Sequence, residues 1–261
     1  MPLGVGGVVV LLALSYFTGT DLLSLLGGDG GVDSAPSGSV GNVQSTPQEE
    51  RMVDFVDAVA SDTQATWNRL LGARYEQTRV VLFRDVAQSS CGTAESATGP
   101  FYCPGDHKVY LDLGFFDELD RKFGAPGDFA QAYVIAHEFG HHVQNLLGTS
   151  DRVAADRRSG ANSASVALEL QADCYAGVWG HEASQGGRVR AGRVELEPGD
   201  ADEALRAASS IGDDRLQKMA TGRVQPERFT HGTSAQRTEW FRRGMDSGDP
   251  AQCNTFRELT Q

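Results

Sequence analysis

Three histidines and one glutamate lie within six residues of the stretch VIAHEFGHHVQNLLG, at Val134–Gly148. Successive residues of an α-helix are about 100° apart, so His137 and His141 share one face and both imidazoles can reach a single ion. Glu138 points to the side of that face, where it can hold a water molecule rather than the ion. This is the arrangement of the H-E-x-x-H motif, which provides two zinc ligands and a general base.

The remaining histidines near this motif are poorer ligand candidates. His142 points about 120° away from the direction that the His137 and His141 side chains share. We therefore expect it on the flank of the helix, either hydrogen-bonded in the core or exposed. His107 and His181 have no partner motif, and we interpret them as structural residues.

A catalytic zinc site needs a third protein ligand and one open position. The extended motif H-E-x-x-H-x-x-G-x-x-H is excluded, because Gln144 and Leu147 stand at its Gly and last His positions. The apolar segment ALELQADCYAGVWG, at Ala167–Gly180, offers Glu169 and Asp173 one turn apart. We predict that Glu169 is the third ligand and that Asp173 accepts a hydrogen bond from a ligand imidazole.

The small residues of these two segments indicate how they meet. Gly140 costs a helix about 1 kcal/mol relative to Ala, and a closely packed neighbouring helix would explain it. Ala172 and Ala176 share the face of Glu169 and Asp173. We therefore expect this second helix to approach Gly140.

Apolar periodicity predicts the elements that position these residues. The expected strands cover 78–83 and 107–113, and the second could pair with an extended substrate as an edge strand does. The expected helices cover 49–71, 129–147, 163–180 and, as one or two helices, 202–219.

The first 48 residues differ in composition from the remainder. Residues 1–26 carry one charge, Asp21, and reach spanning length, so we interpret them as a single membrane anchor, with a cleaved signal peptide and then a buried core helix as the alternatives. Residues 27–48 are mostly Gly, Ser, Asp and Pro and are expected to form a flexible linker. The globular domain is predicted at 49–261.

Net charge and cysteine content limit the partners and the cellular compartment that we expect for the protein. The chain of 261 residues has a formal net charge of −12, which argues against nucleic acid as a partner. The four cysteines are spaced too widely for a zinc finger, and we predict the disulfides Cys91–Cys103 and Cys174–Cys253. Together with the anchor, they favour a cell-membrane protein with an extracytoplasmic domain, or a secreted protein; buried thiols in a cytosolic domain are the alternative.

Several further motifs accompany the zinc-site segments in chain order. They are HEFGHHVQN, ELQADCYAGVWG, GPFYCP, SIGDDRLQ and FTHGTSAQRTEWFRRG. Together they resemble the bacterial "putative neutral zinc metallopeptidase" family, of the gluzincin type, over roughly residues 50–257. The resemblance implies an α+β, zincin-like domain, mainly helical with a small sheet, that hydrolyses peptide bonds with one Zn²⁺. It also implies His137, His141 and Glu169 as ligands and Glu138 as the base.

Hydrolysis also requires a donor for the developing oxyanion. His231 is the candidate, since it precedes the turn-forming Gly232, and Thr233, Gln236 and Arg237 are expected to brace that turn. Peptide or protein substrates follow from this interpretation. Two other classes of function remain open at this point. One is an anchored zinc-binding scaffold or chaperone without turnover, and the other is a protein in which the H-E-x-x-H motif is structural and binds no metal.

Overall fold

The structure is a computed structural model that describes residues 45–95, 99–121, 127–151, 153, 156, 158–185, 194, 196–197 and 199–259. The predicted anchor at 1–26 and residues 27–44 of the predicted linker lie outside this part of the chain. Within the described part, no helix combines the length and the apolar character needed to cross a membrane.

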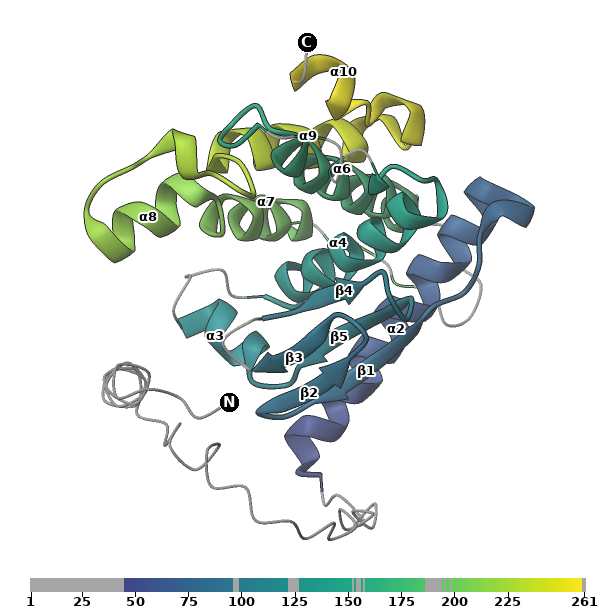
Figure 1. Ribbon diagram of the computed structural model, residues 1–261. Coiled ribbons are helices and arrows are strands. Elements are labelled where there is room, and N and C mark those ends of the chain that lie inside the picture. Colours follow the sequence, from purple (N-terminus) through teal and green to yellow (C-terminus); the bar gives the residue numbers. More distant parts are fainter. Residues whose placement is uncertain are drawn as a thin grey trace, which may run out of the picture. The chain divides into compact units, whose positions relative to one another are not determined.

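The described residues form a mainly helical domain with a small sheet, as expected (Figure 1). The helices are α2 (Pro47–Leu71), α3 (Phe115–Arg121), α4 (Asp128–Leu146), α6 (Ala164–Ser184), α7 (Asp200–Ser210), α8 (Asp213–Thr221), α9 (Ser234–Ser247) and α10 (Thr255–Leu259). The strands are β1 (Arg79–Phe83), β2 (Val86–Ser89), β3 (Gly92–Glu95), β4 (Phe101–Cys103) and β5 (Lys108–Asp112).

The main sheet has the strand order β1-β5-β4. Strand β5 pairs parallel with β1 and antiparallel with β4, so both of its edges are occupied. The expectation that 107–113 offers an edge to a substrate is therefore wrong. The strand at the end of the order beside the helices is β4, which is three residues long and gives no period-two signal. Strands β2 and β3 form a separate antiparallel hairpin.

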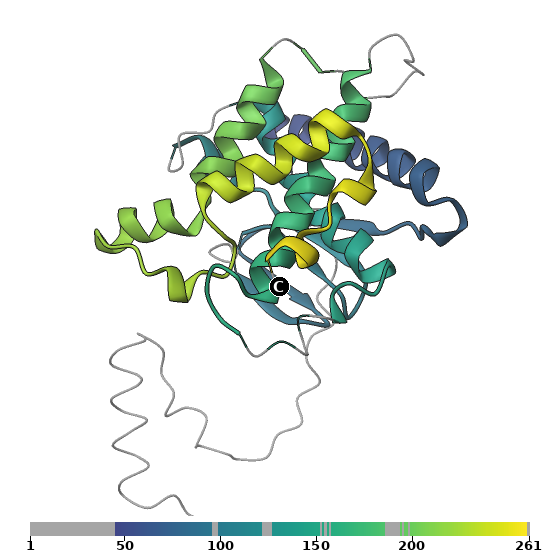
Figure 2. The ribbon, with the colours of Figure 1, turned by 90° about the horizontal axis from the view of Figure 1, so that it is seen from above.

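Helix α4 lies between the sheet and helices α6, α7 and α9 (Figure 1). It contacts β4 and β5 on one side, and α6 and α7 on the other. Helix α9 packs against α6 on the side away from the sheet (Figure 2). The apolar residues of α4 are buried between these layers, which explains why the helix is hydrophobic around most of its circumference.

Capping residues determine where the helices begin. Thr46 and Glu49 form a capping box at the start of α2, with Pro47 in its first turn. The helix therefore begins two residues before the predicted domain start at Glu49. Ser163 caps α6 by accepting a hydrogen bond from the Val166 amide.

The predicted helical region at 202–219 is two helices. Helix α7 ends at Ser210 and α8 begins at Asp213. Gly212 separates them, and a side chain there would collide with the backbone of Ser234. Glycine at this break therefore lets the start of α9 approach closely.

Both predicted disulfides are confirmed, and all four cysteines are paired. Cys91–Cys103 joins the turn of the β2–β3 hairpin to β4. Cys174–Cys253 joins α6 to the segment before α10. Each disulfide therefore attaches a short peripheral piece of the chain either to α6 itself or to β4, which contacts α4.

Candidate metal centre

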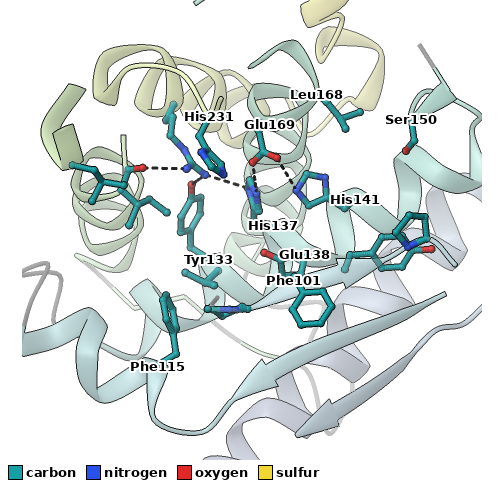
Figure 3. Close-up of a pocket in the computed structure, with 18 residues that line it drawn as sticks. Phe101, Phe115, Tyr133, His137, Glu138, His141, Ser150, Leu168, Glu169 and His231 are labelled. Atoms are coloured by element: carbon teal, nitrogen blue, oxygen red, sulfur yellow. Dashed lines mark hydrogen bonds and ion pairs between the residues drawn. The ribbon is translucent and has the colours of Figure 1, made fainter. Parts of the chain in front are cut away.

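Helices α4 and α6 bring three potential metal ligands together (Figure 3). His137 Nε2 lies 3.3 Å from Glu169 Oε2, and His141 Nε2 lies 3.5 Å from Glu169 Oε1. One ligand atom from each of the three residues lies within 4.8 Å of the other two. The one-turn histidine pair and the predicted carboxylate thus converge on one point.

These distances can be tested against zinc. A tetrahedral zinc has bonds of about 2.0–2.1 Å to nitrogen and oxygen, which separates two of its ligand atoms by about 3.3–3.4 Å. His137 Nε2 and His141 Nε2 lie 3.3 and 3.5 Å from different oxygens of the Glu169 carboxylate, which is close to this spacing. Two imidazole nitrogens and one carboxylate are also a ligand set that zinc accepts. The residues present therefore fit a zinc ion.

The other ring nitrogen of each histidine has its own partner. His137 Nδ1 donates to Asp173 Oδ1 at 2.8 Å, so the contact predicted for Asp173 is present. His141 Nδ1 donates to Gln144 Oε1 at 2.8 Å. Both rings therefore direct Nε2 towards Glu169. The partner of His141 was not anticipated, although its i, i+3 spacing on α4 could have indicated it.

Asp173 is the centre of a buried polar cluster. Tyr133 Oη donates to Asp173 Oδ1 at 2.5 Å, and the Arg237 guanidinium donates to both carboxylate oxygens at 2.8 and 2.9 Å. The expectation that Arg237 braces a turn is wrong, because it lies in the first turn of α9 and its side chain is only 3 % exposed. Tyr133 was also missed; it precedes His137 by four residues and so shares its face.

The surrounding charges favour a cation at this point. Burial acts to lower the pKa of His137, but the Asp173 carboxylate outweighs it and raises this pKa to about 10. Against the same effect of burial, Glu169 raises the pKa of His141. Burial acts to raise the pKa of Glu169, yet His141 and His137 hold it well below its usual range. The carboxylates thus stabilise positive charge between these side chains.

Gly140 permits the close approach of α4 and α6, as predicted. A Cβ at Gly140 would lie 3.0 Å from the carbonyl oxygen of Ala172 and 3.3 Å from its Cβ. The next residue after Gly140 is the potential ligand His141, and Ala172 lies three residues after Glu169. The contact between the two backbones therefore sets the distance between the ligands.

His142 is hydrogen-bonded in the core rather than exposed. It is 1 % exposed, with Nε2 2.6 Å from the carbonyl oxygen of Glu76 and Nδ1 3.1 Å from Tyr102 Oη. Both ring nitrogens are thus engaged on the side of α4 that faces β4. It takes no part in the group formed by His137, His141 and Glu169.

A cavity of about 630 Å³ opens onto the three potential ligands. Glu138 and His231 both line it, so the residues predicted to act on a substrate share one space (Figure 3). Its other lining residues include Phe101, Tyr102, Phe115, Val134, Leu168, Ile211, Leu216 and Arg237.

The His231 segment is held by the start of α8. Asp213 Oδ2 accepts hydrogen bonds from the backbone amides of Thr230, His231 and Gly232 at 2.7, 2.6 and 3.0 Å. A hydrogen bond from the His231 ring to Asp213 raises the pKa of this histidine. Immediately after it, Thr233 and Gln236 form the capping box of α9 and so brace the turn as predicted.

Comparison with known proteins agrees with this arrangement. Over residues 2–256, the chain matches the model of the family described as "Putative neutral zinc metallopeptidase". It is 46% identical to "Uncharacterized protein YpfJ" of Escherichia coli K12 over 269 residues, which cover 98% of this chain and 88% of that protein. It is 47% identical to "Uncharacterized protein Rv2575" of Mycobacterium tuberculosis over 205 residues, which cover 77% of this chain and 69% of that protein.

No solved structure matches the chain. The family match nevertheless spans nearly the whole sequence, and both relatives exceed 45% identity over most of their length. Within that span, His137, His141 and Glu169 form a compact group of potential ligands on two adjacent helices. The chain belongs to the "Putative neutral zinc metallopeptidase" family.

Proposed function

We propose that this protein is a zinc-dependent peptidase in which His137, His141 and Glu169 hold the ion. The observation that carries the proposal is the convergence of two imidazole nitrogens and one carboxylate within 4.8 Å of one another, a ligand set that zinc accepts, beside a cavity lined by a further carboxylate. Family membership supports the same chemistry and a peptide or protein as substrate. The three protein ligands leave one position open, as catalytic zinc requires.

Glu138 is the proposed general base. When bound, zinc supplies a Lewis acid that polarises a carbonyl and lowers the pKa of water to about 7. Glu138 follows the first ligand in the helix and is 7 % exposed, at the wall of the cavity. Its carboxylate would take the proton of the attacking water and then deliver it to the leaving amine.

His231 is the proposed donor to the developing oxyanion. It lines the same cavity, and the three amide hydrogen bonds to Asp213 fix its backbone. Its raised pKa favours the protonated ring, which has a donor to spare after the hydrogen bond to Asp213. A donor held in place before the reaction stabilises developing charge without reorganisation.

The walls of the cavity favour peptides with large apolar side chains. Phe115, Val134, Ile211 and Leu216 contribute aromatic and aliphatic surface, and the charge of Arg237 is compensated by Asp173. An apolar substrate side chain against these four residues would bury its surface, whereas a charged one would lose hydration there.

Strand β4 is the proposed binding edge for the substrate backbone. It has a single partner in the strand order, and Phe101 and Tyr102 line the cavity. An extended peptide that added to this edge would run past the ligands.

We further propose that the domain works outside the cytoplasm, attached to the membrane through residues 1–26. Two disulfides in a domain of this size are typical of an oxidising compartment. A secreted protein is the alternative, in which the apolar N-terminal segment is removed.

The test is zinc content together with cleavage of an unbiased peptide library by the full chain, wild type beside Glu138→Gln. We expect one zinc per chain in both proteins and cleavage by the wild type alone. Glu182→Gln is the matched control, because Glu182 lies on α6 but pairs with Arg69 away from the cavity. A wild type with zinc and no cleavage would favour a scaffold, and a wild type without zinc would favour a structural H-E-x-x-H.

A further inference from the structure

Two buried glutamines connect the metal centre to the C-terminal segment of the domain. Gln144 follows His141 by three residues on α4, and its side chain is fully buried. Gln171 lies two residues after Glu169 on α6 and is 7 % exposed. Gln144 Nε2 donates to Gln171 Oε1 at 3.2 Å, so the two amides form a pair between the helices.

We propose that Gln144 is a positioning residue that fixes the ring orientation and the tautomer of His141, and that Gln171 in turn fixes Gln144. The inference rests on the proposed function only in that His141 is taken as a metal ligand. It extends that function by assigning a role to an amide pair on the far side of the ligand ring.

The orientation of both amides follows from hydrogen bonds to backbone carbonyls, which can only accept. Gln144 Nε2 donates to the carbonyl oxygen of Leu168 at 2.7 Å. Gln171 Nε2 donates to the carbonyl oxygen of Cys253 at 2.8 Å. Rotating either amide by 180° would set oxygen against oxygen in a buried place, which is costly.

The orientation of Gln144 then determines the state of the His141 ring. Its Oε1 is directed at His141 Nδ1, 2.8 Å away, and an amide oxygen can only accept. His141 Nδ1 must therefore carry the proton, which leaves the lone pair of Nε2 for the ion beside Glu169. Backbone carbonyls on α6 and before α10 thus select the ligating nitrogen of a histidine on α4.

The two ligand histidines have partners of different charge. His137 donates to the Asp173 carboxylate, which is itself neutralised by Arg237. His141 donates to a neutral amide that needs no counter-charge. Partners of this kind hold ligand rings in place, and their removal typically lowers metal affinity about 10–100-fold.

The experiment compares zinc affinity and folding stability in the full chain carrying Gln144→Met or Gln171→Met. Methionine is close in shape to glutamine and lacks both amide functions. We expect Gln144→Met to weaken zinc binding about 10–100-fold in competition with a chromophoric chelator. Gln171→Met leaves the Leu168 hydrogen bond of Gln144 intact, so it should weaken zinc binding less, while both variants lose stability.

If the two glutamines are purely structural, the loss of zinc affinity should be in the same proportion to the loss of folding stability in both variants. That outcome, or wild-type zinc affinity in a folded Gln144→Met, overturns the proposal. A wild type that binds zinc without cleaving peptides refutes the proposed function alone, whereas a wild type that binds no zinc refutes both.

A second measurement does not depend on the folding of any variant. In the zinc-loaded wild type, the Nδ1 protons of His137 and His141 should both give slowly exchanging NMR signals. A rapidly exchanging His141 Nδ1 proton beside a protected one on His137 overturns the proposal. Where Gln144→Met folds, it should abolish protection at His141 and preserve it at His137.

Discussion

The contact between Gly140 and Ala172 makes Gly140→Ala a sensitive test of how the metal centre is built. The added Cβ would meet the carbonyl oxygen, Cα and Cβ of Ala172 at 3.0, 3.1 and 3.3 Å. Ordinary contacts of this kind lie at 3.4–4 Å, so α4 and α6 must separate by a few tenths of an ångström. Alanine improves helix propensity by about 1 kcal/mol, whereas overpacking a core costs about 1–3 kcal/mol.

The expected change in unfolding free energy is therefore a loss of about 0–2 kcal/mol. Zinc affinity should be more sensitive to the separation of the helices than folding stability is, because the separation occurs beside His141 and one turn from Glu169. Metal sites tolerate deviations of only about 0.2 Å in ligand distance. We expect Gly140→Ala to weaken zinc binding at least about tenfold, comparable to the loss of a hydrogen-bond partner of a ligand.

The assay combines urea unfolding of the zinc-free protein with zinc competition against a chelator. Gly180→Ala is the matched control, because its Cβ would meet the flexible end of the Met245 side chain and lies eleven residues beyond Glu169, about 16 Å along α6. It should leave zinc affinity unchanged and cost little or no stability. If Gly140→Ala behaves like this control in both measurements, the reasoning that this contact sets the ligand spacing is refuted.

Three further predictions concern the metal centre and the disulfide next to it. Glu169→Ala should remove most of the zinc measured by elemental analysis, whereas His142→Ala should keep zinc and lose stability, because it removes a buried ring that is hydrogen-bonded to the Glu76 carbonyl and the Tyr102 hydroxyl; full zinc occupancy in Glu169→Ala would exclude it as a ligand. His231→Ala should keep zinc and fold but lower kcat about 10²–10³-fold, and unchanged kcat would make this residue structural. Cys174–Cys253 should be intact in unreduced peptide maps of protein from its native compartment and should stabilise the domain by about 2–4 kcal/mol; free thiols there would contradict the proposed localisation.

The features that could be predicted from the sequence are those that depend on residues close to one another in the chain. The one-turn spacing of His137 and His141 is a property of any α-helix, so the ligand pair could be recognised before the fold was known. The close approach at Gly140 could also be inferred, because glycine within an apolar helix is unfavourable without a packing reason. Long apolar segments gave both ends of α4 to within one residue and the start of α6, whereas α6 continues one turn beyond its predicted end, to Ser184.

Other features depend on contacts between segments that are distant in the chain, and the sequence did not predict them. Strand β4 is three residues long and exists through its pairing with β5, so no periodicity predicted it. The same pairing made β5 a central strand, although its alternating pattern is equally typical of an edge. Arg237 was assigned to a turn because its neighbours Thr233 and Gln236 are turn and cap residues.

The sequence by itself determined which residues are potential zinc ligands, that a second helix offers a carboxylate to them, and which cysteines pair. These follow from helical spacing, from the apolar setting of Glu169 and Asp173, and from cysteine positions. Only the tertiary structure decided that Arg237 neutralises Asp173 and that Gln171 pairs with Gln144. Those contacts join α4, α6 and α9, which are distant in the chain, and partners of buried polar groups are chosen by how helices pack rather than by the spacing of residues within any one of them.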